Sequence, residues 1–197
     1  MSENISRKLI LGSTSPYRRE LLARLRIPFD VIAPDVDETP QSGESPQQLA
    51  CRLAMTKARE VAAKFPASVV IGSDQVADLD GQPLGKPGDH RRAVAQLQQM
   101  RGKTVVFQTA VAVVCQETLF AQMDLAQVKV RFRDLSDAEI EAYLQAETPY
   151  DCAGSAKSEG LGIALLEFIE NDDPTALVGL PLIRTCQMIQ AAGIRIL

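Results

Sequence analysis

Residues 9–19 read LILGSTSPYRR, an apolar stretch that runs directly into small hydroxyl residues, a proline and two arginines. The apolar half predicts a buried strand, and Ser15 predicts the N-cap of a helix whose first position is Pro16. Cations in the first turn oppose the helix dipole, so Arg18 and Arg19 are poorly placed for helix stability alone. A phosphate bound at this helix N-terminus would resolve the conflict. The alternative is an ordinary Ser-Pro cap followed by two solvated arginines.

The composition is that of a globular protein, with 197 residues, of which 46% are hydrophobic and 23% charged. This length suits one domain over residues 1–197. No apolar run approaches the roughly 20 residues that a membrane span needs. The polar N-terminus lacks the core of a signal peptide, so we expect a cytoplasmic protein without a membrane partner. The formal net charge of −4 argues against a nucleic-acid binder but leaves room for a small anionic ligand.

The cysteines and the single histidine restrict the chemistry that this chain can perform. No C-x-x-C pair is present, so zinc and redox motifs have no support. His90 follows Gly88-Asp89 at a predicted helix start, and we expect it to be solvated rather than catalytic. Phosphate chemistry must therefore rest on carboxylates, lysines and arginines. The four cysteines are expected to be small buried apolar residues: Cys51, Cys115, Cys152 and Cys186.

Hydrophobic periodicity and capping signals predict alternating helices and strands. Strands are expected at 8–12, 29–33, 69–72, 104–115 and 119–133, and helices at 16–26, 46–64, 89–101, after Ser136, and between Pro181 and Gly193. Asp80-Gly81 is typical of a hairpin turn. Parallel and antiparallel strands mixed with helices predict an α/β fold, with a twisted mixed sheet flanked by helices.

One lysine stands where an apolar residue is expected. Leu49, Leu53, Lys57 and Val61 recur at intervals of four, which places Lys57 on the apolar stripe of its helix. Such a lysine either extends its ammonium to water or meets a buried anion. Lys86, in a Gly-Lys-Pro loop, lacks the P-loop pattern and is a weak signal alone.

Several acidic residues stand where a metal or a reacting group could be bound. Asp74 follows an apolar strand, and ligands gather at the carboxyl ends of strands in open α/β sheets. Asp37 and Glu38 lie in a loop closed by prolines at both ends. Hard oxygen ligands suit Mg²⁺ or Mn²⁺, which usually also bind substrate phosphates. The alternative is that each acid only caps a helix or a turn.

Seven segments together resemble the Maf family of nucleotide pyrophosphatases over nearly the whole chain. They are STSPYRR at 13–19, VDETP at 36–40, RLAMTKA at 52–58, IGSDQV at 71–76, GKP at 85–87, CAGSAKSEG at 152–160 and LVGLPL at 177–182. The resemblance implies a Maf/ITPase-like fold with two lobes around a central cleft. It also implies metal-dependent cleavage of a nucleoside triphosphate to the monophosphate and pyrophosphate.

The resemblance also implies a role for each matching residue. Asp74 would accept the proton of the attacking water, and Glu38 would help with the metal or the water. Asp74 and Glu38 would hold the divalent metal, Mg²⁺ or Mn²⁺, and which of the two binds the metal and which activates the water stays open. The residues implied to bind the phosphates or to neutralise their charge are Ser13, Ser15, Arg18, Arg19, Lys57 and Lys86. This chemistry is plausible in itself, because phosphoryl transfer is catalysed mostly by positioning and charge neutralisation. A homodimer is the assembly considered.

Three positions make the chain similar to the family branch that acts on 7-methyl-GTP rather than on dTTP and UTP: Tyr17, Gln75 and Glu159. N7-methylation leaves guanine cationic, and an aromatic face attracts a cationic ring. A carboxylate such as Glu159 can accept hydrogen bonds from the guanine N1–H and amino group. The chain departs from this branch in having Tyr17 instead of tryptophan and Ala156 instead of a larger aromatic residue, which predicts lower selectivity.

Two alternatives remain open on the sequence. One is a dTTP and UTP pyrophosphatase of the same family. The other is a nucleotide-sensing regulator without catalysis, since cell-division effects are associated with members of the family. In each case the expected partner is a small nucleotide, not a nucleic acid.

Overall fold

The computed structural model describes residues 7–197. Its strands are β1 (Leu9–Gly12), β2 (Asp30–Ile32), β3 (Val69–Leu79), β4 (Gln82–Leu84), β5 (Thr104–Cys115), β6 (Phe120–Phe132) and β7 (Leu166–Glu170). Its helices are α1 (Pro16–Ala23), α2 (Pro46–Lys64), α3 (His90–Met100), α4 (Asp137–Glu147) and α5 (Leu182–Ala191). Three short 3₁₀ helices are η1 (Ala153–Ser155), η2 (Leu161–Leu165) and η3 (Ala176–Val178).

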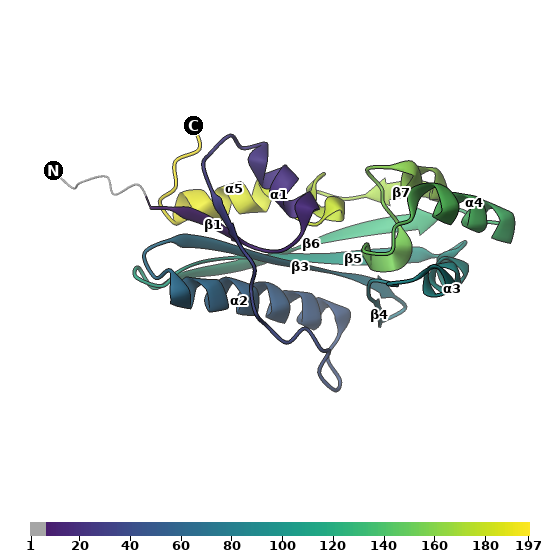
Figure 1. The fold of residues 1–197 in the computed structure, drawn as a ribbon, viewed down its shortest axis with the longest axis horizontal. Helices are drawn as coiled ribbons and strands as arrows, with labels where there is room; N and C mark the ends of the chain where they lie inside the picture. Colours follow the sequence, from purple (N-terminus) through teal and green to yellow (C-terminus); the bar gives the residue numbers. More distant parts are fainter. Residues whose placement is uncertain (1–6) are drawn as a thin grey trace.

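The strands form one mixed sheet in the order β2-β1-β3-β5-β6-β7, with β4 paired to β3. β1 runs parallel to β2 and β3, and the other pairs are antiparallel. Figure 1 shows α2 on one face of this sheet and α1 and α5 on the other. The predicted fold class, a mixed sheet flanked by helices, is confirmed. The division into two lobes stays a prediction.

The core follows the alternation of side chains along the strands. On β1, Ile10 packs with α2, whereas Leu9 and Leu11 pack with α1 and α5 on the opposite face. A third apolar cluster joins α3 and α4 to the far ends of β3, β5 and β6. The long strands β3 and β5 therefore connect both ends of the core, and a site between these ends has a continuous sheet as its floor.

Gly72 allows α2 to lie directly on β3. A Cβ atom at this position would lie 2.3 Å from the Ala54 carbonyl oxygen and 2.6 Å from the Ala58 nitrogen. No side chain fits in that space without a shift of the helix backbone. The close contact brings Lys57, the neighbour of Ala58, over the next residues of β3.

Most local predictions from the sequence are confirmed. Both capping boxes form, at Ser45 with Gln48 and at Ser136 with Glu139. Asp80 and Gly81 link β3 to β4 with positive φ angles of 53° and 81°, as a tight hairpin turn requires. Local hydrogen bonds and backbone preferences account for these features without help from the rest of the fold.

Three expectations are corrected by the structure, and one strand was missed. The strand expected at 69–72 continues to Leu79, because its second half pairs with β5 and β4. The first helix ends at Ala23 rather than 26, since Arg26 takes a left-handed conformation with φ 56°. Strand β7 was not expected, and it pairs with the end of β6. Of the four cysteines only Cys115 is buried, and the other three are half-buried.

No helix within residues 7–197 is long and apolar enough to cross a bilayer.

Candidate active site

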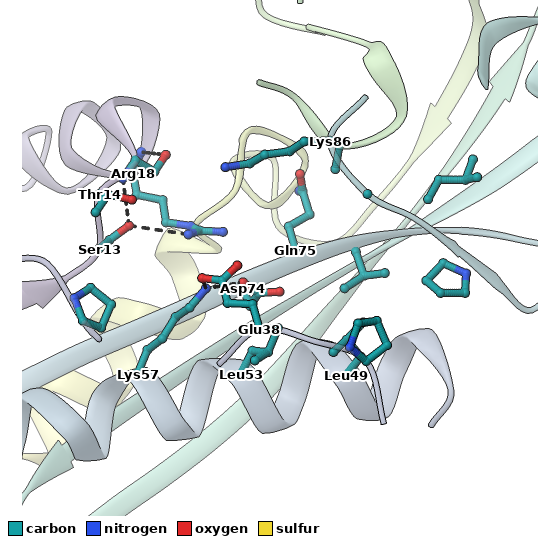
Figure 2. A pocket seen from close by; sticks show the side chains of 18 residues that line it. Ser13, Thr14, Arg18, Glu38, Leu49, Leu53, Lys57, Asp74, Gln75 and Lys86 are labelled. Carbon is teal, nitrogen blue, oxygen red and sulfur yellow. Dashed lines mark hydrogen bonds and ion pairs between the residues drawn. The ribbon is translucent and has the colours of Figure 1, made fainter. Parts of the chain in front are cut away.

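A cavity of about 350 Å³ opens above the middle of β3 (Figure 2). Its lining comes from the start of α1, the loop after β2, the inner face of α2, β3 and the loop after β4. The site residues expected from the sequence that line it are Ser13, Ser15, Arg18, Glu38, Lys57, Asp74, Gln75 and Lys86. Segments far apart in the sequence thus converge on one cavity that carries three cationic and two acidic side chains.

Lys57 lies between two carboxylates at the floor of this cavity. Its Nζ is 2.6 Å from Asp74 Oδ1 and 2.7 Å from Glu38 Oε1. The lysine is only 5% exposed and Asp74 only 8%. The sequence left open whether Lys57 extends to water or meets an anion, and the structure shows that it meets two anions.

Asp74 owes its position to the end of a neighbouring strand. The expectation that it terminates its own strand is wrong, since β3 continues five residues further. The parallel neighbour β1 does end here, with Gly12 paired to Gly72. Beyond that pair, the edge of β3 that faces β1 has no neighbouring strand, and Asp74 lies two residues further along this unpaired edge. The carboxyl end that matters is therefore that of β1.

The start of α1 is capped by its own side chains. Ser15 Oγ accepts a hydrogen bond from the Arg18 backbone N–H, and Ser13 Oγ accepts one from the Ser15 N–H. The Arg18 guanidinium turns back into the protein, and its Nε donates to the Gly179 carbonyl at 2.8 Å. Burial lowers the pKa of Arg18, an effect that Asp74 and Glu38 oppose.

The two arginines of α1 therefore differ. Arg18 lines both this cavity and the next one, whereas Arg19 is exposed and lines neither. The solvated alternative thus describes Arg19, and a role for Arg19 with phosphate stays a prediction. His90 also lies outside both linings, partly exposed between Tyr150 and Glu141.

Glu38 reaches the cavity from the loop between β2 and α2. Burial acts to raise its pKa, but the hydrogen bond and charge of Lys57 act against it, and the pKa lies below its ordinary value. Arg52 holds this loop against α2: its Nε donates to Glu44 Oε1 at 2.6 Å and its Nη2 to the Thr39 carbonyl at 3.1 Å. Sequence reasoning missed Arg52, which fixes the loop that carries Glu38.

A second cavity of about 230 Å³ adjoins the first and shares Arg18, Gln75 and Lys86 with it. Its lining includes Tyr17, Gln75 and Glu159, so the three residues expected to set specificity lie around one space. Figure 2 shows Lys86 extending from its loop toward the start of α1. The two cavities together form one site, with Lys57, Asp74 and Glu38 in the first part and Tyr17 and Glu159 in the second.

The ring of Tyr17 already has a cation over it. Lys157 Nζ lies 5.7 Å from the ring centroid, and the same ammonium is paired with Glu147 at 3.1 Å. Burial raises the pKa of Tyr17, and Cys152 and Asp151 add to the effect, so the phenol is neutral at neutral pH. Burial likewise raises the pKa of the Cys152 thiol to about 11, which leaves it unreactive as a nucleophile at neutral pH.

The acidic residues fit a divalent metal only together with further ligands. Within residues 7–197 no group of three or more His, Cys, Asp or Glu side chains could hold a metal ion. Glu38 and Asp74 do converge on one cation, the Lys57 ammonium. Two carboxylates are what Mg²⁺ usually takes from a protein when substrate phosphates and water supply its other ligands. The donor set therefore fits a metal that binds with the nucleotide.

Two buried hydroxyl residues were also missed from the sequence. Ser73 Oγ lies 2.8 Å from the Ala110 carbonyl oxygen and 3.0 Å from that of Gly179. Thr109 Oγ1 donates to the Ala176 carbonyl at 3.0 Å. Both side chains are fully buried within otherwise apolar strands. A polar residue in such a strand needs a hydrogen-bond partner, and this was the signal that could have identified them.

Comparison with known proteins gives a consistent result. The family model "Maf-like protein" matches residues 8–192. A 7-methyl-GTP pyrophosphatase of Albidiferax ferrireducens is 83% identical over 197 residues, which is 100% of this chain and 99% of the relative. Proteins of the same name from Polaromonas sp. and Cupriavidus metallidurans are 75% and 58% identical, over 96% and 98% of this chain and 86% and 97% of the relatives.

Among solved structures, that of a HAM1 protein from Coxiella burnetii aligns with 66% of this chain and 74% of its own, at a TM-score of 0.43 and 12% identity. The sequence matches are far stronger, and the order of motifs from Ser13 to Pro181 agrees with them. The chain belongs to the family of Maf-like proteins.

Proposed function

We propose that this protein hydrolyses 7-methyl-GTP to 7-methyl-GMP and pyrophosphate. The observation that carries the proposal is the junction of two cavities. The first is lined by three cations and two carboxylates, and the second shares Arg18 and Lys86 with it and adds an aromatic ring and acceptor groups. The first suits a triphosphate and the second a purine base with donors on its edge. Relatives of up to 83% identity carry the name of this activity.

The cations of the first cavity are proposed to hold the triphosphate. Arg18, Lys57 and Lys86 reach the cavity from three separate segments, so that a polyanion can contact all three at once. The N-terminus of α1 adds a positive dipole end, although Pro16 has no N–H group and that of Arg18 is bonded to Ser15 Oγ. Negative charge that develops on the leaving pyrophosphate is stabilised by the same groups, which need no reorganisation during the reaction.

Asp74 is proposed to take the proton from the water that attacks the α-phosphorus. The bond between the α-phosphorus and the oxygen bridging to the β-phosphorus breaks, and pyrophosphate leaves with that bond's electron pair. Asp74 and Glu38 would hold a divalent metal, Mg²⁺ or Mn²⁺, which neutralises phosphate charge when bound. The hydrogen bond from Lys57 keeps the Asp74 carboxylate oriented toward the cavity.

The base is proposed to stack against Tyr17 and to donate hydrogen bonds to Glu159. The position of Lys157 over the Tyr17 ring illustrates that this ring attracts a cation. A 7-methylguanine ring is cationic in the same way, and the Glu159 carboxylate meets both its charge and its N–H donors. We also propose that the protein acts in the cytoplasm, where free nucleotides are found. Homodimer formation stays a prediction, and the molar mass measured by light scattering would test it.

The experiment that tests the function is a comparison of steady-state rates. We expect kcat/KM for pyrophosphate release, with Mg²⁺ or Mn²⁺, to be higher on 7-methyl-GTP than on GTP, dTTP or UTP. A preference for dTTP or UTP would overturn the substrate and leave the pyrophosphatase activity standing. Nucleotide binding by calorimetry without pyrophosphate release from any of the four would instead favour the regulator.

Glu159→Gln tests the contact with the methylated base. The substitution keeps the size of the side chain but removes the charge that favours a cationic ring. We expect the ratio of kcat/KM on 7-methyl-GTP to that on GTP to fall about fivefold, the equivalent of one charge-assisted contact of about 1 kcal/mol. Glu20→Gln, which removes an exposed carboxylate from α1, is the matched control. Equal losses on both substrates would show that Glu159 does not contact the ring.

A further inference from the structure

The amide group of Gln75 is held from one side by three acceptors. Its Nε2 lies 2.9 Å from Thr109 Oγ1 and 3.0 Å from each of the carbonyl oxygens of Ala176 and Leu177. Thr109 belongs to β5, the strand next to Gln75, and the two carbonyls belong to η3. An amide nitrogen has two hydrogens, so these acceptors use its whole donor capacity.

The surroundings leave one orientation for this amide. The single hydroxyl hydrogen of Thr109 is donated to the Ala176 carbonyl at 3.0 Å, so its oxygen can only accept from Gln75. If the amide were turned over, its oxygen would face two carbonyl oxygens and an oxygen without a free hydrogen. Oxygen atoms that all carry partial negative charge repel one another at such distances. The amide nitrogen would also lose its hydrogen-bond acceptors. Thr109 and η3 therefore decide which atom of Gln75 is turned outward.

The outward atom is the carbonyl oxygen, Oε1. Figure 2 shows it at the outer end of the side chain, on the side where Lys86 lies. Gln75 lines both cavities, and within the described residues no hydrogen bond to its Oε1 is found. A group that binds beside Gln75 therefore meets an acceptor from this side chain and no donor from it.

We propose that Thr109 is a positioning residue for base recognition, which fixes Gln75 as an acceptor for the 2-amino group of a guanine base. This inference rests on the proposed function and extends it. Glu159 lines the same cavity and is a second acceptor. Guanine offers two adjacent donors, N1–H and the 2-amino group, so two acceptors in one cavity suit its edge. Uracil and thymine offer one donor there, which leaves one acceptor without a partner.

The test compares 7-methyl-GTP with 7-methyl-ITP, a nucleotide that differs only in lacking the 2-amino group. We expect the unmodified protein to favour 7-methyl-GTP in kcat/KM by about fivefold to tenfold, the effect of one hydrogen bond in a closed site. Thr109→Val keeps the branched shape but puts a methyl group where the hydroxyl lies 2.9 Å from Gln75 Nε2, which is too close for a methyl group. Although the two η3 carbonyls remain as acceptors, the amide is then displaced, and we expect the ratio to fall below about twofold. The loss is expected in KM rather than kcat, because the groups around Asp74 are unchanged.

Two variants accompany this measurement. Thr109→Ser restores a hydroxyl, and we expect it to recover most of the ratio. Thr104→Val makes the same change at an exposed position of the same strand, and we expect the ratio to be unchanged. If Thr109→Val does not fold, as judged by its melting curve, Gln75→Met serves in its place and should also abolish the ratio.

The outcomes separate this inference from the proposed function. A ratio retained in Thr109→Val or in Gln75→Met, or lost equally in Thr104→Val, overturns the role of Thr109. Equal rates of the unmodified protein on 7-methyl-GTP and 7-methyl-ITP, with both above dTTP and UTP, overturn this inference and leave the proposed function standing. A preference for dTTP or UTP overturns the proposed function itself.

Discussion

Asp74→Asn is expected to lower kcat for pyrophosphate release at least about 100-fold. The substitution keeps the size of the side chain and its place beside Lys57, but an amide cannot accept a proton from water at neutral pH. Lys57 Nζ, 2.6 Å from Asp74 Oδ1, also loses a charged partner at the floor of the cavity. The measurement is the rate of pyrophosphate release from 7-methyl-GTP at saturating substrate with Mg²⁺ or Mn²⁺.

Asp78→Asn is the matched control for this prediction. Asp78 lies on the same strand, four residues further along, and accepts a hydrogen bond from the Gly81 N–H in the hairpin turn. An asparagine there can still accept that bond, so we expect kcat to be unchanged. Asp74→Asn should still bind the nucleotide in calorimetry, which separates lost chemistry from lost binding. Retention of more than a tenth of kcat would contradict the role of Asp74.

Lys57→Met is expected to damage both activity and stability. The methionine fills the space of the lysine stem but leaves the carboxylates of Asp74 and Glu38 without their shared ammonium. Removing one partner of a buried ion pair costs about 3–5 kcal/mol, and the open cavity reduces this to about 2 kcal/mol of unfolding free energy. Loss of one preorganised cation at the phosphates should lower kcat/KM by about 100-fold or more.

The double variant Lys57→Met with Asp74→Asn shows whether the ion pair is the cause. With both charges removed, position 74 no longer carries a buried carboxylate without a partner. We therefore expect the free energy of unfolding, measured in urea, to recover about half of what Lys57→Met alone loses. Lys64→Met, at the exposed end of the same helix, should leave stability and activity unchanged. If Lys57→Met were more stable than the unmodified protein, the lysine would be only a stem packed on the core, with its charge in water.

The local features of the fold were accessible from the sequence because each depends on residues close together in the chain. The capping boxes need a serine and a partner three residues later, and the β3–β4 turn needs two residues that tolerate positive φ. The alternation of Val128, Val130 and Phe132 with charged residues predicted a strand with one buried face, and these three are at most 1% exposed. Such signals act within a few residues, whatever the tertiary structure.

The candidate site was accessible only in part. The sequence singled out Lys57 for its place on an apolar stripe and Arg18 for its conflict with the helix dipole, and both line the cavity. It misjudged Asp74, because the continuation of β3 depends on pairing with β5, a partner outside the local sequence. It missed Thr109, because nothing in the sequence distinguishes this hydroxyl from the others in the chain before its hydrogen-bond partners are known.

The sequence by itself determined most of the elements, the apolar faces that pack them and the membership in a family with recognisable motifs. Only the tertiary structure decided which groups meet: Lys57 with Asp74, 17 residues apart, Gln75 with Ala176, 101 apart, and Arg18 with Gly179, 161 apart. Helix caps and strand alternation arise from interactions between neighbours, whereas these contacts exist only after the sheet and α2 have packed. An ammonium between two carboxylates, or an amide with one allowed orientation, is a property of that packing.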